Sequence, residues 1–194
     1  MKFYILFFTI LFLIFGCKDD SVDTEEQEPK EVVGFIYGEK GFDLPPLSPL
    51  AADETAQWGV LNDLLDEIKK IYGSDYMNVR TRAENVKEYT DSVVNSVPEG
   101  LHTHAINSRV LVLKTRAALL YESSHLGSID TSQIQKSIRE LNRATANLLM
   151  QFNEKAQKDR INRERSADEE KERKKISKTR DSIFELERQD MNRQ

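Results

Sequence analysis

The sequence predicts an all-α protein, an antiparallel four-helix bundle with an N-terminal extended segment and a long charged C-terminal helix. Apolar residues recur three and four positions apart in four stretches within residues 51–152, which is the period of an amphipathic helix. Only a few residues join one stretch to the next, and short connections between helices of matched length favour neighbours that run in opposite directions. Residues 153–194 keep a helix-favouring composition without Gly or Pro, so we expect them to form a charged helical extension.

Each helix of the bundle is predicted from an apolar stripe and from its end signals. The first spans about residues 51–72, the second 76–96 and the third 103–125. The fourth begins at Asp130, which fits a capping box with Gln133. The residues expected to face the core are Trp58, Leu61, Leu65, Ile68 and Tyr72; Val79, Ala83, Val86, Val93 and Val97; Ile106, Val110, Leu113, Ala117 and Leu120; and Ile134, Ile138, Leu141, Leu148 and Phe152.

The first sixteen residues have the pattern of a signal peptide. Lys2 is followed by an uncharged, largely apolar run that ends at Gly16, and charge returns at Lys18. This run is shorter than the roughly 20 apolar residues that a permanent transmembrane helix requires. We therefore expect residues 1–16 to be a cleaved export signal.

The stretch "IFGC", which ends at Cys17, resembles the lipobox of bacterial lipoproteins, although Phe15 is bulkier than is usual in that motif. The resemblance implies cleavage before Cys17 and attachment of a diacylglyceryl group, with acyl chains such as palmitate, to its sulfur. Two or three acyl chains form a lasting membrane anchor. The alternative is an ordinary secreted protein with one unpaired cysteine, an unusual residue for an oxidising compartment.

The three residues after Cys17 are Lys18, Asp19 and Asp20, and they are similar to a surface-export signal of some double-membraned bacteria. This similarity implies a lipoprotein of the outer membrane that faces outward. Lys18 in place of an aspartate also argues against retention in the inner membrane.

Composition shifts divide the remaining chain. Without residues 1–16 the chain carries 27 basic and 33 acidic residues, a formal charge of -6, and its one cysteine excludes disulfides within the fold. Residues 17–31 are acidic and nearly free of aliphatic side chains, so we expect a disordered tether. Residues 32–50 combine aromatic residues with prolines, which indicates an extended segment. That segment either packs across the helical domain or serves as an exposed strand for a partner.

The charged tail contains the candidate partner-binding residues. Residues 154–194 hold 13 basic and 11 acidic side chains, and Ile176, Ile183 and Leu186, with Met191 less clearly, form a faint apolar seam near the end. The seam covers two heptads, fewer than a secure coiled-coil prediction requires. We expect a protein partner or self-association through residues 154–194.

The sequence contains no pattern that predicts catalysis, a cofactor or a metal. His104 and His125 lie 21 residues apart on one predicted helix, about 31 Å, so one ion cannot bind both. Residues 171–180 hold six basic side chains and one acidic one, which could meet phosphates or an acidic partner, but the acidic run at 168–172 largely offsets this charge. Nucleic acid is not expected as a partner of an exported, acidic, lipid-anchored protein.

These observations predict a membrane-anchored, non-enzymatic envelope lipoprotein that acts as an interaction or scaffold protein through its helical domain and charged tail. The alternative is a ligand-binding or chaperone-like envelope module that holds apolar cargo in a cleft between helices or on residues 35–44.

The lipid anchor makes a direct prediction. Cys17→Ala removes the only sulfur that can carry the lipid, so the variant should be released from membranes or mislocalised and should not incorporate labelled fatty acid. Fractionation with metabolic lipid labelling measures both effects. A variant that remains membrane-bound and is processed like the parent would contradict the anchor assignment.

Overall fold

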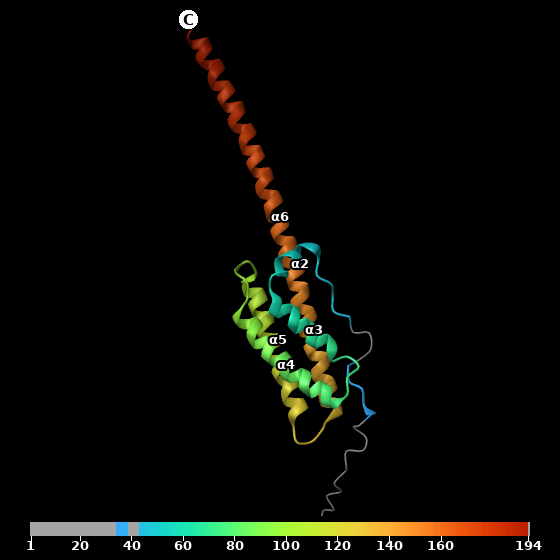
Figure 1. Ribbon diagram of the computed structural model, residues 1–194. Helices are drawn as coiled ribbons and strands as arrows, with labels where there is room; N and C mark the ends of the chain where they lie inside the picture. The colour runs from blue at the N-terminus through green and yellow to red at the C-terminus, as the bar shows by residue number, and fades with distance from the viewer. Residues whose placement is uncertain (1–33, 39–42, 194) are drawn as a thin grey trace, which may run out of the picture. The chain divides into compact units, whose positions relative to one another are not determined.

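The structure is a computed structural model of the chain and describes residues 34–38 and 43–193. Within these ranges the chain is all-α, as predicted, with five α-helices and no strand. The elements are α2 (Pro49–Thr55), α3 (Gly59–Lys70), α4 (Tyr76–Asn95), the short 3₁₀-helix η2 (Glu99–Leu101), α5 (His104–His125) and α6 (Thr131–Met191). Figure 1 shows their order along the chain.

Polar side chains set the start of four helices. The residues Ser48, Asp75, Thr103 and Asp130 precede α2, α4, α5 and α6, and a side-chain oxygen of each accepts a backbone N–H three residues on. At α6 the Asp130 carboxylate accepts from the Gln133 backbone N–H at 2.9 Å. These bonds satisfy donors that have no partner inside the helix. The fourth helix therefore begins where the capping pattern predicts.

The prediction of one helix over residues 51–72 is wrong, because the structure divides it into α2 and α3. The chain leaves helical geometry at Trp58, whose backbone N–H donates to the Thr55 carbonyl at 2.9 Å. The Trp58 ring is buried edge-on against Phe152, with ring centroids 6.0 Å apart, and its Nε1 donates to Ser96 Oγ at 3.0 Å. Contacts with residues far along the chain thus accompany the break, and local periodicity does not reveal them.

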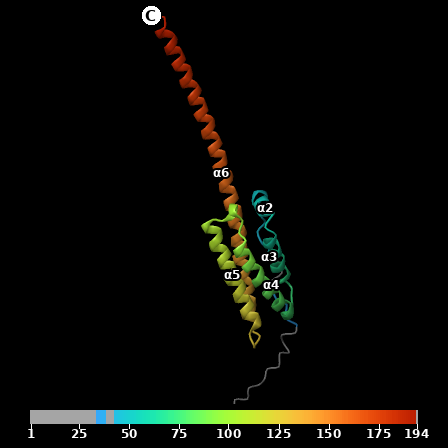
Figure 2. The same ribbon diagram turned by 60° about the vertical axis from the view of Figure 1, so that its left-hand side comes forward.

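The helices share one hydrophobic core. In this core α5 packs against both α4 and α6, α3 packs against α4, and α2 packs against α6. Figures 1 and 2 show α4, α5 and the first part of α6 side by side. The predicted stripes of the third and fourth helices are buried throughout. In the predicted stripes of the first two helices, three residues are only half-buried: Leu65, Tyr72 and Val97. Leu64 is buried in place of Leu65, and Ile71 in place of Tyr72.

A short segment around Tyr37 is fixed to the start of α6. Tyr37 is fully buried, and its backbone pairs with the loop after α3, donating to the Ser74 carbonyl at 2.8 Å and accepting from the Gly73 N–H at 2.9 Å. The Gly38 N–H donates to Gln135 Oε1 at 3.1 Å. Gly38 has a positive φ of 77°, which glycine adopts without strain.

Residues 43–50 are fixed farther along the same helix by Asn153. Its side chain accepts from the Ser48 backbone N–H at 2.7 Å and donates to the Pro46 carbonyl at 3.0 Å. Leu44 and Leu47 pack against the core. Of the two alternatives for the extended segment, packing on the helices is observed for these leucines and for Tyr37, whereas Phe35 and Ile36 are exposed.

Helix α6 continues beyond the core without interruption. It runs from Thr131 to Met191 (Figure 1). Its last buried side chain is Ala156. From residue 157 to residue 193 every side chain is exposed or half-exposed. The predicted helical continuation of the tail is therefore confirmed as far as Met191. Of the helices in the described ranges, none is both long enough and apolar enough to cross a membrane.

The packing of α5 predicts opposite outcomes for two leucines on that helix. Leu113 is fully buried, whereas Leu111 is 55% exposed. Leu113→Asp should abolish the cooperative thermal transition, because an unpaired charge in a core costs several kcal/mol against a total of about 5–15 kcal/mol. Leu111→Asp, the matched control, should melt close to the parent. Equal melting temperatures for parent and Leu113→Asp would show that α5 packs differently.

Candidate functional site

The predicted seam residues lie on the solvent-exposed part of α6. Ile176, Ile183 and Leu186 are 62%, 50% and 62% exposed, so they contribute nothing to the core. Contiguous exposed apolar side chains mark interaction surfaces, so these residues make this part of α6 a candidate contact surface. We call residues Ile176, Thr179, Ile183 and Leu186 the tail seam.

Phe184 is an apolar residue of this surface that sequence reasoning missed. It is 58% exposed and, with Ile176 and Ile183, borders a shallow groove of about 680 Å³ along the helix. The other lining residues are Glu172, Lys175, Thr179, Arg180 and Glu187. A strict heptad template leaves Phe184 outside the seam, but a wider apolar stripe would have included it.

The ion pairs of the tail are local and solvent-exposed. Lys171 pairs with Asp168 at 3.0 Å and Lys174 with Glu170 at 2.7 Å, and the side chains of both pairs are more than half exposed. Such pairs contribute only tenths of a kcal/mol and are screened by salt. They support the helix weakly and are easily exchanged for pairs with another chain.

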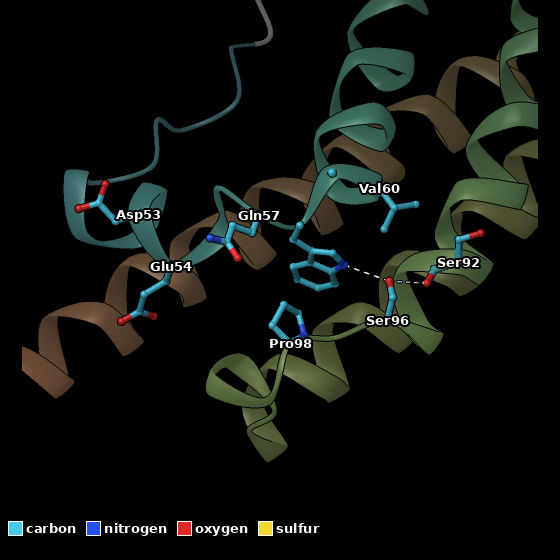
Figure 3. A pocket seen from close by; sticks show the side chains of 9 residues that line it. Asp53, Glu54, Gln57, Val60, Ser92, Ser96 and Pro98 are labelled. Carbon is cyan, nitrogen blue, oxygen red and sulfur yellow. Dashed lines mark hydrogen bonds between the residues drawn. The ribbon is translucent and has the colours of Figure 1, made fainter.

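A second candidate site is the depression where α2, α3 and the end of α4 meet (Figure 3). Figure 3 shows Asp53 and Glu54 on the α2 side, Ser92 on α4 and Ser96 just after the end of α4. The depression has a volume of about 730 Å³ and is open to solvent. The Trp58 indole forms part of its wall, and its N–H is already bound to Ser96.

The charged groups beside this depression serve the fold. Lys155 of α6 binds Glu54 at 3.1 Å and Asp159 at 2.6 Å, which ties α2 to α6. Burial lowers the pKa of the Lys155 ammonium, but hydrogen bonds and charge from Asp159 and Glu54 outweigh burial and raise it. The depression can accept a polar group through hydroxyls and carboxylates. Of its two carboxylates on α2, Glu54 is already held by Lys155.

Glu67 on α3 is the one buried carboxylate among the described residues. Arg82 of α4 binds it at 2.9 Å, Lys70 at 2.8 Å and the Asn85 amide at 3.4 Å. Burial raises the pKa of the Glu67 carboxyl, but the hydrogen bonds from Lys70, Arg82 and Asn85 and the charge of Arg82 together lower it below its ordinary value. A carboxylate held ionised by three partners clamps α3 to α4 and is not an available proton donor.

Two of the three histidines lie close to groups a few residues away in the chain. His102 Nδ1 lies 3.4 Å from the Asn107 amide nitrogen, and His125 Nδ1 lies 2.8 Å from the Tyr121 carbonyl. Residues 34–38 and 43–193 contain no group of three or more His, Cys, Asp or Glu side chains that could hold a metal.

Cys17 and the sorting residues Lys18, Asp19 and Asp20 lie outside the described residues, as do the signal peptide and the tether. Comparisons of the chain with models of protein families, with curated proteins and with solved structures found no match.

The Glu67 clamp predicts a pH-dependent contribution to stability. Because the folded-state pKa is lowered, the stabilisation is complete above the ordinary pKa of 4.5 and is lost as the pH falls through the folded value. Glu67→Gln should lower the free energy of unfolding by about 1–2 kcal/mol at pH 7, since it weakens bonds to partly exposed partners. Denaturant titrations should show this difference shrinking as the pH falls below 4.5.

Asp66→Asn provides the matched control. Asp66 is the preceding residue, its side chain is 65% exposed, and it pairs with Lys69 at 3.3 Å. This variant should unfold within a few tenths of a kcal/mol of the parent. An equally large loss for both variants, or a Glu67→Gln loss independent of pH, would contradict the clamp.

Proposed function

We propose that this protein is a membrane-anchored, non-enzymatic envelope lipoprotein that acts as an interaction or scaffold protein through its helical domain and charged tail. In this proposal α3, α4, α5 and α6 form an antiparallel four-helix bundle, and the lipid is attached to Cys17. The observation that carries the proposal is the exposed part of α6.

Residues 157–191 form about 35 residues of helix, roughly 52 Å, without a buried side chain. They contribute no apolar surface to the core, so folding of the domain does not account for them. A helix that is polar on most of its surface either bridges to another structure or is only partly stable alone. The exposed apolar groups near its end favour the first role.

The positions of the two ends of the domain support a scaffold. Gly38, which leads back toward Cys17, bonds to Gln135 in the first turns of α6. Ile176 lies 41 residues farther along that helix, about 62 Å. Gly38, at the N-terminal end of the described domain, and the tail seam are thus well apart along α6, which supports a role in bridging two attachments.

Capture from membranes tests the proposal against the ligand-binding alternative. The full chain is compared with a chain that ends at Arg160. The cut is placed there because Asn153 and Lys155 hold residues 46–54 in place. Loss of a protein partner without residues 161–194 supports the scaffold. Unchanged protein partners together with a co-purifying small molecule would favour the depression beside Trp58 as a binding site.

A triple substitution in the seam sharpens the test. Ile176→Ser, Ile183→Ser and Leu186→Ser together should reduce association at least tenfold, since each removes partly buried apolar area at the interface, and should leave the melting temperature unchanged. Sedimentation or capture measures the first effect and circular dichroism the second. The matched control is Leu111→Ser, Val112→Ser and Leu119→Ser, three exposed apolar residues on α5. A destabilised domain with intact association would overturn the role of the tail.

A further inference from the structure

We propose that the tail binds a second copy of itself in antiparallel orientation, with Ile176 of one copy opposite Leu186 of the other. This inference rests on the proposed function of the tail as an interaction element, and adds the identity of the partner and its direction. Three features of residues 168–191 carry it: the spacing of the seam, the order of the charges, and the flank on which two charges lie.

The spacing of the seam is self-complementary. Ile176, Thr179, Ile183 and Leu186 follow one another at intervals of three, four and three residues, which places them on one face of α6. A two-fold axis at residue 181 sets Ile176 against Leu186 of the second copy and Thr179 against Ile183. All four seam positions then meet an apolar residue or a threonine methyl of the other copy.

The order of the charges favours the antiparallel direction. Residues 171–180 carry six basic and one acidic side chain, a net charge of +5, whereas residues 181–190 carry four acidic and one basic, a net charge of -3. In a parallel pair each block would face the same block of the other copy, so like charges would repel each other in both blocks. An antiparallel pair about residue 181 sets the basic block of one copy against the acidic block of the other, so electrostatics decides the orientation.

One specific pair reinforces this choice. Arg173 and Glu187 are fourteen residues apart and lie on the same flank of the seam. In an antiparallel pair this flank meets the same flank of the partner. Arg173 then faces Glu187 of the second copy, and by symmetry Glu187 faces Arg173 of the second copy. In a parallel pair Arg173 would face Asp168 of the second copy, but Lys175 would face Arg180 of the second copy and the two like charges would repel. Arg180 meets its own counterpart at the two-fold axis, which limits the affinity of the antiparallel pair.

The seam has only four layers, two of which pair Thr179 with Ile183, so the dimer is weak in dilute solution and becomes populated when copies are concentrated. Attachment of copies to one membrane supplies such a concentration, because it converts a bimolecular encounter into a local one. The inference therefore describes a contact between neighbouring anchored copies and not an obligate dimer.

Distances between spin labels test the orientation. Ala167 and Asp181 both lie on the outer face of the pair, away from the seam, and each is changed to a labelled cysteine in the full chain carrying Cys17→Ser. For the antiparallel pair, the two Asp181 labels lie at the same height, whereas the two Ala167 labels are 28 residues apart along the axis, about 42 Å. A short distance at Asp181 and a much longer one at Ala167 supports the inference. Equal distances at both positions indicate a parallel pair and overturn it.

A charge exchange provides an independent test. Arg173→Glu and Glu187→Arg should each weaken self-association, by about fivefold for two symmetric surface pairs, and the double variant should restore it. In a parallel pair the double variant would remain weak, because the carboxylate introduced at position 173 would then face Asp168. Sedimentation equilibrium measures the association, and circular dichroism shows that each variant keeps its helix.

The absence of dipolar coupling at both label positions, at high protein concentration, overturns self-association. This result is distinguishable from failure of the proposed function, because capture would still detect a different protein that requires residues 161–194. If capture also finds no protein that depends on the tail, both proposals fail together.

Discussion

The arrangement of this protein depends on one helix whose apolar stripe is shorter than the helix itself. From Ile134 to Ala156 the inner face of α6 packs against α5 and α2. Beyond Ala156 the apolar positions are filled by charged residues, so packing no longer holds the helix to the core, although the residues still favour helical geometry. The first part of α6 thus provides a rigid support, and the second part presents side chains to solvent at a distance set by helical rise.

The N-terminal segment stabilises that support from outside the core. Two sets of contacts tie residues 37–38 and residues 46–48 to points 18 residues apart on α6, Gln135 and Asn153, about 27 Å. Each satisfies backbone groups that have no helical partner. Trp58 acts similarly between α3, α4 and α6, filling space against Phe152 while its N–H binds Ser96. Side chains that join distant elements therefore complete the core.

Charge has different roles in the two parts of the protein. Near the core, Glu67 and Lys155 are shielded from solvent and hold pairs of helices together. On the tail the pairs are exposed and individually weak, so their total contribution to stability is small. Their order along the sequence nevertheless creates a basic block followed by an acidic block. In the proposed antiparallel pair this order sets the direction of the contact, and it adds little to the stability of the helix itself.

The sequence by itself determined the helices, most of their ends and most of the core. Caps such as Asp130 and stripes such as Ile106 to Leu120 act through neighbours within one or two turns, so their physical signal is local. It also marked Ile176, Ile183 and Leu186 as apolar residues within a charged helix; the structure shows them exposed, and their role as a contact surface stays a prediction. Only the tertiary structure decided the break at Trp58, the burial of Tyr37, the clamp at Asn153, and the choice of Leu64 over Leu65. In each case the deciding partner, such as Phe152, Ser74 or Pro46, lies far away in the sequence, and periodicity carries no information about contacts at that separation.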